Sequence, residues 1–267
     1  MGNGMVGGSL ARFFDSQGVK VGVYDPPQGK MDISVLCDAE MIFLCVPTPF
    51  RLDGSGFDDR FIREAVEAIP ADGKTIVIKS TAIPGTTEKL QSAYPQHRFL
   101  FNPEFLTEAT ADEDMRHPNR QILGCTTQSR GDAERVMSLL PRAPFEKITD
   151  ARVAETVKYF CNAFYALKVA YANQMHDFCH AIGAAYDDVK ACVETEPMVG
   201  GNHLAVFHKG YRGYGGKCLP KDVRAVIQIA EQSGVDLSLL KQAEAYNNAL
   251  GLSQGLDIGW PEGSPRT

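Results

Sequence analysis

The sequence lacks the features that mark several large classes of protein. Its longest apolar runs, such as residues 41–46 (MIFLCV), fall far short of the roughly 20 residues that a membrane-spanning helix needs. No block of Lys and Arg is present, and 27 basic against 33 acidic residues give a net charge of −6, which disfavours a nucleic-acid partner. The first residues show no basic region followed by an apolar one, so no signal peptide is expected.

Cysteine is present, but its pattern fits neither a metal site nor a disulfide framework. The seven cysteines are irregularly spaced and include no Cys-x-x-Cys pair, which argues against both and favours the reducing cytoplasm. His176 and His180 lie one helical turn apart, but Asp177 stands where zinc peptidases carry Glu, and no third ligand is evident. We therefore expect no metal site.

A glycine fingerprint opens the chain. Residues 2–7 read GNGMVG, apolar residues follow at helical spacing, and a strand is expected over residues 19–24, ending at Asp25. In a dinucleotide-binding fold these glycines permit a tight turn, close approach to the pyrophosphate and close helix–sheet packing. The pyrophosphate rests on the helix N-terminus, and the acid accepts hydrogen bonds from ribose hydroxyls. An acid at this point predicts NAD rather than NADP, because it repels a 2′-phosphate.

The first half of the chain alternates strand-like and helical patterns. Strand-like runs lie at residues 41–46, 74–79, 97–101, 120–124 and 144–148, and helical patterns lie at 57–69 and 131–140. This alternation predicts an α/β fold with a doubly wound, parallel, Rossmann-like sheet. Residues 151–182 then form one long helical pattern without Pro or Gly. We expect an NAD-binding domain over residues 1–149, a mostly helical domain over 150–250 and a loose tail over 251–267.

The most informative segment is residues 210–222 (GYRGYGGKCLPKD). Its glycines let the backbone lie close against a ligand. Cys218 is flanked by Lys217 and Lys221, and nearby cations favour the thiolate form of a cysteine. These are the properties of a nucleophile.

At this segment the sequence resembles a known family. Residues 210–222 look like the active-site cysteine motif of the UDP-glucose/GDP-mannose dehydrogenase family. Four further segments match the family in order, namely residues 45–49 (CVPTP), 79–84 (KSTAIP), 101–108 (FNPEFLTE) and 154–164 (AETVKYFCNAF). The resemblance extends from residue 2 to about residue 250, and chance agreement of five ordered motifs is negligible.

The resemblance implies oxidation of a nucleotide-sugar alcohol to the carboxylate with two molecules of NAD, and UDP-glucose is the expected substrate. In such a reaction a thiolate attacks the aldehyde, and the thiohemiacetal gives up a second hydride to become a thioester. Cys218 matches the position of that thiolate. Lys158 and Asn162 are four residues apart and so on one helix face, where a cation and an amide can both point at a developing oxyanion. Lys158 is also a candidate base in the first oxidation.

By the same resemblance, three groups of residues form the expected site. The catalytic residues are Cys218, Lys158, Asn162, Asp222, Glu104 and Thr81, of which the last three orient the water for thioester hydrolysis. NAD is expected to contact Gly2, Gly4, Met5, Val6, Gly7, Asp25, Lys30, Thr48, Thr81, Glu108 and Lys221. The nucleotide sugar is expected to contact Glu104, Phe105, Leu106, Thr107, Glu108, Lys158, Asn162, Phe207, Tyr211 and Gly215.

The sequence departs from the family pattern in two ways. A buried strand should precede the glycine fingerprint, yet only Met1 does, and family members carry a third domain that closes over the nucleotide. A late start would explain the missing strand, a split enzyme would explain the missing domain, and a fragment or a natural short form would explain either. Weak NAD binding with poor turnover is then expected. This departure also leaves the sugar open among UDP-glucose, GDP-mannose and UDP-N-acetylhexosamine.

Two other functions fit parts of the same sequence. A two-electron dehydrogenase of the 3-hydroxyacid type shares the two-domain plan but needs no cysteine. A non-catalytic NAD-binding or assembly module would need none of the catalytic set.

Because apolar residues surround much of the helix expected over 151–182, a homodimer across that helix is expected, as in the family.

Overall fold

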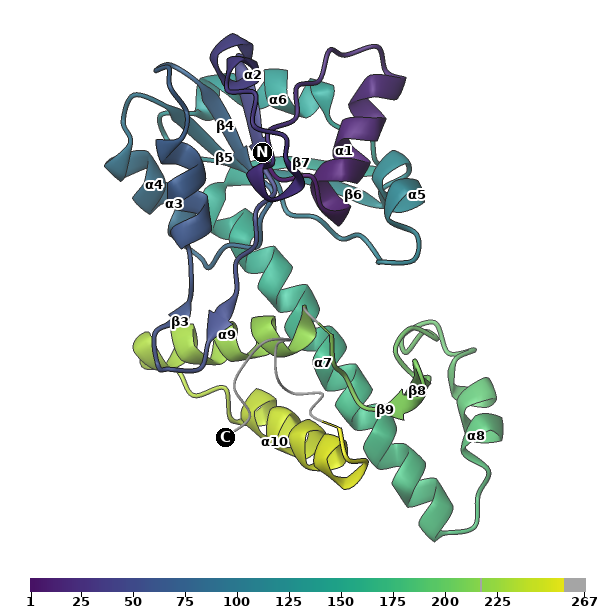
Figure 1. Ribbon diagram of the computed structural model, residues 1–267. Coiled ribbons are helices and arrows are strands. Elements are labelled where there is room, and N and C mark those ends of the chain that lie inside the picture. Colours follow the sequence, from purple (N-terminus) through teal and green to yellow (C-terminus); the bar gives the residue numbers. More distant parts are fainter. Residues whose placement is uncertain (217, 257–267) are drawn as a thin grey trace. The chain divides into compact units, whose positions relative to one another are not determined.

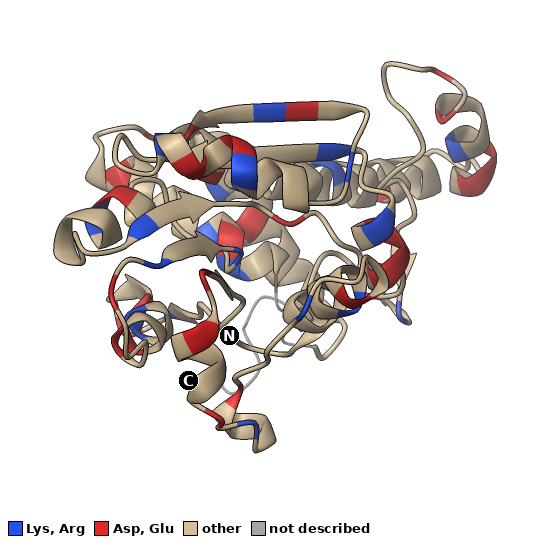
Figure 2. Cartoon of the chain, turned by 90° about the horizontal axis from the view of Figure 1, so that it is seen from above, with Lys and Arg blue, Asp and Glu red and all other residues tan. Residues whose placement is uncertain are grey.

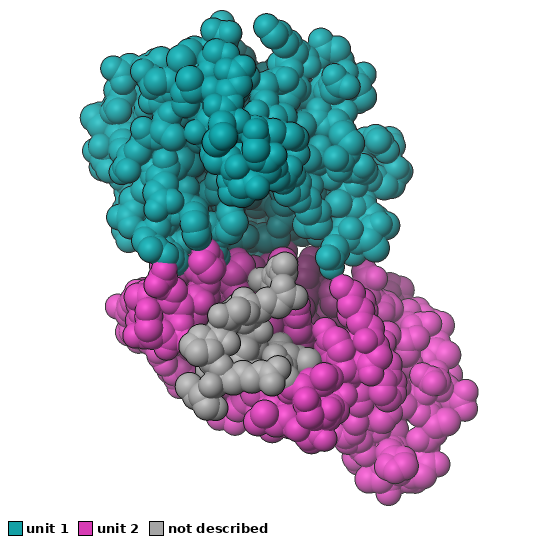
Figure 3. Space-filling view, in the orientation of Figure 1, with its two compact units in different colours: residues 1–48, 58–158 teal, residues 49–57, 159–267 magenta. Residues whose placement is uncertain are grey.

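The computed structural model describes residues 1–216 and 218–256, which form two compact units (Figures 1 and 3). The first unit contains residues 1–48 and 58–158, and the second contains residues 49–57 and the chain from Tyr159 onward. The sequence predicts a domain boundary between residues 149 and 150, whereas the two units divide after Lys158, inside a long helix. Lys217 and residues 257–267 of the expected tail lie outside the described residues.

A five-stranded sheet forms the centre of the first unit, in the order β1-β4-β5-β6-β7. This confirms the five expected strand runs and the mostly parallel, Rossmann-like sheet. Ile78, the last residue of β4, pairs with Leu44 of β1 and Phe101 of β5, so the segments after these three strands leave the sheet at one edge. The strands are β1 (Met41–Leu44), β4 (Thr75–Ile78), β5 (Arg98–Phe101), β6 (Arg120–Cys125) and β7 (Phe145–Asp150).

One strand pair corrects the expectation of a wholly parallel sheet. β5 and β6 are antiparallel, with Leu100 opposite Cys125, while β6 and β7 are parallel to each other. An apolar run has no direction of its own, so the direction of β6 depends on the connection before it. That connection returns to the sheet where β5 leaves it, because the Asn102 side chain donates to the backbone carbonyl of Ile122 at 2.7 Å.

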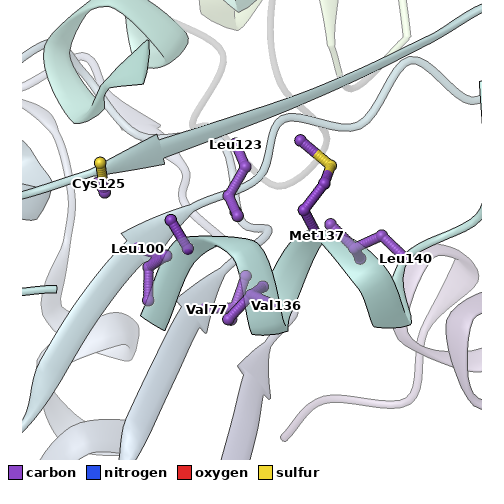
Figure 4. Packing of buried hydrophobic residues seen from close by; sticks show 8 residues of the cluster. Val77, Leu100, Leu123, Cys125, Val136, Met137 and Leu140 are labelled. Atoms are coloured by element: carbon purple, nitrogen blue, oxygen red, sulfur yellow. The ribbon is translucent and has the colours of Figure 1, made fainter. Parts of the chain in front are cut away.

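Helices cover the sheet and enclose its core. Val77, Leu100 and Leu123, from three strands of the sheet, pack with Val136 and Met137 of α6 (Figure 4). α5 packs against α1. The helices of this unit are α1 (Met5–Ser16), α2 (Ser34–Asp38), α3 (Arg60–Glu67), α4 (Thr86–Ala93), α5 (Ala111–Arg116) and α6 (Ala133–Leu139), with single 3-10 turns at Pro26–Gln28 and Arg130–Asp132.

The prediction of a strand over residues 19–24 is wrong, because this segment forms no strand. Met1 lies beside β1, where its amino group donates to the Phe43 carbonyl at 2.6 Å and its own carbonyl accepts from Cys45 at 2.8 Å. The backbone N–H of Gly2 then donates to the Tyr24 carbonyl at 3.0 Å. A strand requires a ladder of such hydrogen bonds. Across the described residues, the 19–24 segment has no strand beside it to supply that ladder.

The second unit is mostly helical and is built on α7 (Ala151–Ala181), which confirms the long helix expected there. Ala166 of α7 packs with Val223 of α9 and Leu240 of α10. α10 continues into the segment that was expected to be a loose tail. The other elements are α8 (Tyr186–Val193), α9 (Leu219–Gln232), α10 (Ser238–Ser253) and two hairpins, β2 (Phe50–Arg51) with β3 (Gly56–Phe57) and β8 (Phe207–His208) with β9 (Tyr211–Arg212).

In the part of the chain that the structure describes, the charged residues show no separation by sign, and the helices are not of the membrane-spanning kind. Figure 2 shows acidic and basic residues intermingled on the helices and strands. None of the helices among the described residues is both long enough and apolar enough to cross a membrane.

Candidate active site

The glycine loop has the close packing that its motif predicts. Gly2 has φ +80°, and a side chain there would approach the Cys45 carbonyl oxygen to 2.4 Å. A side chain at Gly7 would approach the Gly2 carbonyl oxygen to 2.0 Å. Gly4 caps α1 without a side-chain hydrogen bond, and a Cβ there would meet nothing within 4 Å. A helix N-terminus without a side-chain cap fits the pyrophosphate of NAD.

Met5 and Val6 begin α1, and Asp25 lies against the loop that precedes this helix. The Asp25 carboxylate is 7% exposed and accepts from the backbone N–H of Asn3 at 2.6 Å. The backbones of Asp25 and Lys30 pair in both directions, at 2.8 and 3.1 Å, around the 3-10 turn. The expected acid and the exposed lysine are therefore held next to each other beside the glycine loop.

Thr48, Thr81 and Glu104 follow the three parallel strands whose ends share one edge of the sheet. Thr48 is buried, and Thr81 is half-buried. Because carboxyl ends of parallel strands are where ligands bind in open α/β sheets, these positions suit a nucleotide cofactor and its substrate.

Glu104 forms a buried ion pair with Lys158. The Lys158 ammonium donates to Oε1 of Glu104 at 2.8 Å and to the Glu104 backbone carbonyl at 2.7 Å. The side chains are 7% and 10% exposed. Burial alone would raise the pKa of Glu104, but the Lys158 charge, its hydrogen bond and the N–H of Leu106 outweigh burial and lower that pKa. The ion pair therefore favours the ionised form of Glu104.

The residues after Glu104 form a loop with mixed exposure. The Arg120 guanidinium lies over the Phe105 ring at 3.9 Å, and the Lys158 ammonium lies 5.6 Å from the same ring. Leu106 is half-buried, whereas Thr107 and Glu108 are exposed. The expected substrate segment thus carries one aromatic ring held by cations and two exposed polar residues.

A buried network supports this loop, and sequence reasoning did not single it out. Lys79, directly after β4, is 5% exposed and donates to Oδ1 of Asn102 at 2.6 Å. Asn102 in turn donates to Gln121 at 2.7 Å. Burial lowers the pKa of Lys79. The available signal was a lysine directly after the apolar residues 76–78 of β4.

The second unit holds Cys218, Asn162 and Asp222. Cys218 is exposed and occupies the N-cap of α9. One turn on, Asp222 is 1% exposed and accepts from Asn162 Nδ2 at 2.6 Å and from Lys221 Nζ at 2.5 Å. Helical spacing puts Cys218 and Asp222 on one face of α9. Asn162 and Lys158 lie one turn apart on the uninterrupted α7.

The remaining expected substrate residues lie on the β8–β9 hairpin and after it. Phe207 is 64% exposed. Tyr211 pairs with His208 across the hairpin, and Gly215 is half-buried within the glycine segment before Cys218. The structure therefore divides the expected residues into two groups. One group, around the glycine loop and Glu104, lies in the first unit, and the other, around Cys218 and Asp222, lies in the second.

Sequence comparison relates the chain to one family. Its profiles match as "UDP-glucose/GDP-mannose dehydrogenase family, NAD binding domain" over residues 28–140 and as "central domain" over residues 152–249. A UDP-glucose 6-dehydrogenase of Pseudomonas aeruginosa is 35% identical over 231 residues, covering 79% of this chain and 49% of the relative. A putative UDP-glucose 6-dehydrogenase of Bacillus subtilis is 33% identical over 229 residues, covering 80% and 52%. The chain spans about half the length of the curated relatives it matches.

Solved structures share the fold. A UDP-glucose dehydrogenase from the archaeon Pyrobaculum islandicum has a TM-score of 0.72 at 25% identity, covering 91% of this chain and 61% of that one. A UDP-D-ManNAc dehydrogenase from Pyrococcus horikoshii has a TM-score of 0.78 at 22% identity, covering 95% and 68%. These comparisons confirm the expected family resemblance, the Rossmann-like fold and the NAD-binding domain.

Proposed function

Because the chain belongs to the UDP-glucose/GDP-mannose dehydrogenase family, we propose that it oxidises the primary alcohol of a nucleotide sugar to a carboxylate. The preferred substrate is UDP-glucose, the sugar in the names of its relatives from P. aeruginosa and B. subtilis. The observation that carries the proposal is in the second unit. Cys218 is an exposed thiol at the N-cap of α9, one turn before the buried Asp222–Asn162 pair.

NAD, when bound, accepts one hydride in each of two oxidations. In the first, the alcohol loses its O–H proton to a base and becomes an aldehyde. The Cys218 thiolate then adds to the aldehyde carbon, and the oxyanion of the resulting thiohemiacetal loses a hydride to become a thioester. Water attacks the thioester, the C–S bond breaks, and the thiolate of Cys218 leaves as the carboxylate forms.

The chain's own side chains suit these steps. Lys158 and Asn162 supply an ammonium and an amide donor, on one face of α7, for the oxyanion that develops at the reacting carbon. Glu104 is ionised and can accept a proton from the attacking water. Asp222 holds Asn162 through its 2.6 Å hydrogen bond and so fixes the direction of that amide.

We further propose that the chain forms a homodimer and works in the cytoplasm. The dimer would use the exposed aromatic residues of α7, Phe160, Phe164, Tyr171 and Phe178. A reducing compartment would keep the exposed thiol of Cys218 in the form that the chemistry needs.

The test is to count NADH per sugar oxidised with UDP-glucose, GDP-mannose and a UDP-N-acetylhexosamine as alternative substrates. Two NADH per sugar are expected. One would indicate a simple two-electron dehydrogenase, and none would indicate a binding or assembly module; either result contradicts the proposal.

Cys218→Ser should abolish uronate formation, because an alkoxide is a far poorer leaving group than a thiolate. The matched control is Cys192→Ser, which removes another exposed thiol, on α8, and should leave turnover unchanged. Mass spectrometry of the sugar product separates aldehyde from uronate. Unchanged uronate formation by Cys218→Ser would refute the covalent mechanism.

A further inference from the structure

Two amide side chains, one on α10 and one at its C-cap, pair with the backbone of the segment that leads to Cys218. Asn247 Oδ1 accepts from the N–H of Tyr214 at 2.7 Å, and its Nδ2 donates to the Tyr214 carbonyl at 2.9 Å. Gln254 Oε1 accepts from the N–H of Arg212 at 2.8 Å, and its Nε2 donates to the Arg212 carbonyl at 3.1 Å. Each amide therefore satisfies both backbone groups of one residue, as a neighbouring strand would.

The spacing of the two amides corresponds to the spacing of their targets. Asn247 and Gln254 are seven residues apart and so lie on one face of α10. Arg212 and Tyr214 are alternate residues, separated by Gly213, which has φ +93°. That conformation is one that residues with side chains rarely adopt. Helix and segment run in opposite senses, because the later helix residue contacts the earlier segment residue.

The side chain of Arg212 fixes the same segment from another helix. Its Nε donates to Oδ1 of Asn173 and its Nη2 to the Asn173 carbonyl, both at 3.0 Å. It also forms an ion pair with Asp177 at 2.7 Å. Arg212 is therefore held by α7 through its side chain and by α10 through its backbone.

We infer that Asn247 and Gln254 are positioning residues that hold residues 211–216 in one conformation and thereby keep Cys218 at the N-cap of α9. A segment with three glycines has unusual conformational freedom, so its order depends on contacts made by other elements. A cysteine at a helix N-terminus is favoured as the thiolate. The inference rests on the proposed function only in taking Cys218 as the nucleophile.

The experiment measures backbone order and thiol reactivity in the same proteins, Asn247→Ala and Gln254→Ala. Gln242→Ala is the matched control, because it removes an exposed amide from the same helix. We expect hydrogen exchange of residues 211–216 to be about tenfold faster in both variants than in the control. Alkylation of Cys218 by iodoacetamide at pH 7, followed by peptide mass spectrometry, should be at least about threefold slower. Alkylation of Cys192 on α8 serves as the internal reference and should not change.

Two results would overturn the inference. Exchange of residues 211–216 at the control rate would show that the amides do not hold the segment. Faster exchange with unchanged Cys218 alkylation would show that the hydrogen bonds serve stability alone. If Asn247→Ala does not fold, Gln254→Ala decides, because Gln254 is only half-buried, at the C-cap of α10. Failure of the proposed function would appear separately, as an absence of NADH from the unmodified chain.

Discussion

Glu155 is a buried carboxylate one turn before Lys158. It is 0% exposed and accepts hydrogen bonds from the N–H groups of Gly85 at 2.6 Å and Thr87 at 2.8 Å, and from the Thr87 hydroxyl at 2.6 Å. Burial, opposed in part by these three donors, raises the pKa of Glu155 to about 7. The carboxylate thus ties α7 to the start of α4 and titrates near neutrality.

The raised pKa predicts how Glu155 affects stability as pH changes. The native chain binds this proton more tightly than the unfolded chain, so the stabilisation is full below roughly pH 4 and is lost as pH rises through about 7. Glu155→Gln removes this titration. Between pH 5 and 8 the variant should gain on the order of 2 kcal/mol relative to the unmodified chain, measured as the free energy of unfolding in urea.

The control for this titration is Glu134→Gln, which removes an exposed carboxyl group on α6. Its difference from the unmodified chain should stay constant over the same pH range. A constant difference for Glu155→Gln as well would show that Glu155 does not titrate near neutrality.

Asp25 predicts the choice between NAD and NADP. Its carboxylate lies against the glycine loop, where a 2′-phosphate on the ribose would meet its negative charge. Asp25→Asn keeps an oxygen acceptor for the N–H of Asn3 but removes the charge. Calorimetric titration should show the preference for NAD over NADP falling by about tenfold.

Lys30, whose backbone pairs with Asp25, adds a cation that favours the phosphate once the carboxylate is gone. Asp32→Asn, at an exposed acid two residues beyond Lys30, is the control and should leave the preference unchanged. Tighter binding of NADP than of NAD by the unmodified chain would contradict this role of Asp25.

Residue types at motif positions singled out the candidate site residues but not the buried residues packed around them. Glu104 and Lys158 belong to separate motifs, and the structure joins them in an ion pair. Lys79 and Glu155 lie inside the quoted motifs, but their burial depends on tertiary packing that a single sequence does not reveal. Asn247 lies outside every motif, because its role depends on the backbone of a distant segment.

At the scale of elements, the sequence predicted which segments are regular but not which partners they have. β1, β4, β5, β6, β7 and α7 form where their apolar patterns lie. Residues 19–24 have the same apolar character but no ladder of backbone partners in the described structure. The direction of β6 was missed for a related reason, since pairing is decided between elements and not within one.

The hairpin of β2 and β3 shows the same limit. It lies within the first half of the sequence, yet it belongs to the second compact unit, where Gln228 of α9 donates to the Gly54 carbonyl at 3.4 Å. Gly56 of this hairpin leaves room for Gln228, because a Cβ there would come within 1.8 Å of its side-chain oxygen. Domain boundaries drawn from composition alone cannot show that a short segment of the first half belongs to the second unit.

At the scale of the whole molecule, the aromatic face of α7 points to assembly. Phe160, Phe164, Tyr171 and Phe178 are 73%, 53%, 62% and 54% exposed. Their separations of 4, 7 and 7 residues are close to whole helical turns, so the four rings lie on one face that extends about 27 Å along the helix. Exposed apolar patches of this kind mark interaction sites. A second copy of the chain would cover the face through a symmetric, isologous contact.

The homodimer can be tested by sedimentation at micromolar concentration, where twice the chain mass is expected. Phe164→Glu should weaken the dimer by about 2 kcal/mol or more, roughly thirtyfold in the dissociation constant, because it places a charge among buried aromatic rings. Leu239→Glu is the matched control, since Leu239 is 71% exposed on α10 and lies away from the aromatic face in sequence. A monomeric mass for the unmodified chain, or equal dissociation of both variants, would show that the aromatic face of α7 is not the dimer contact.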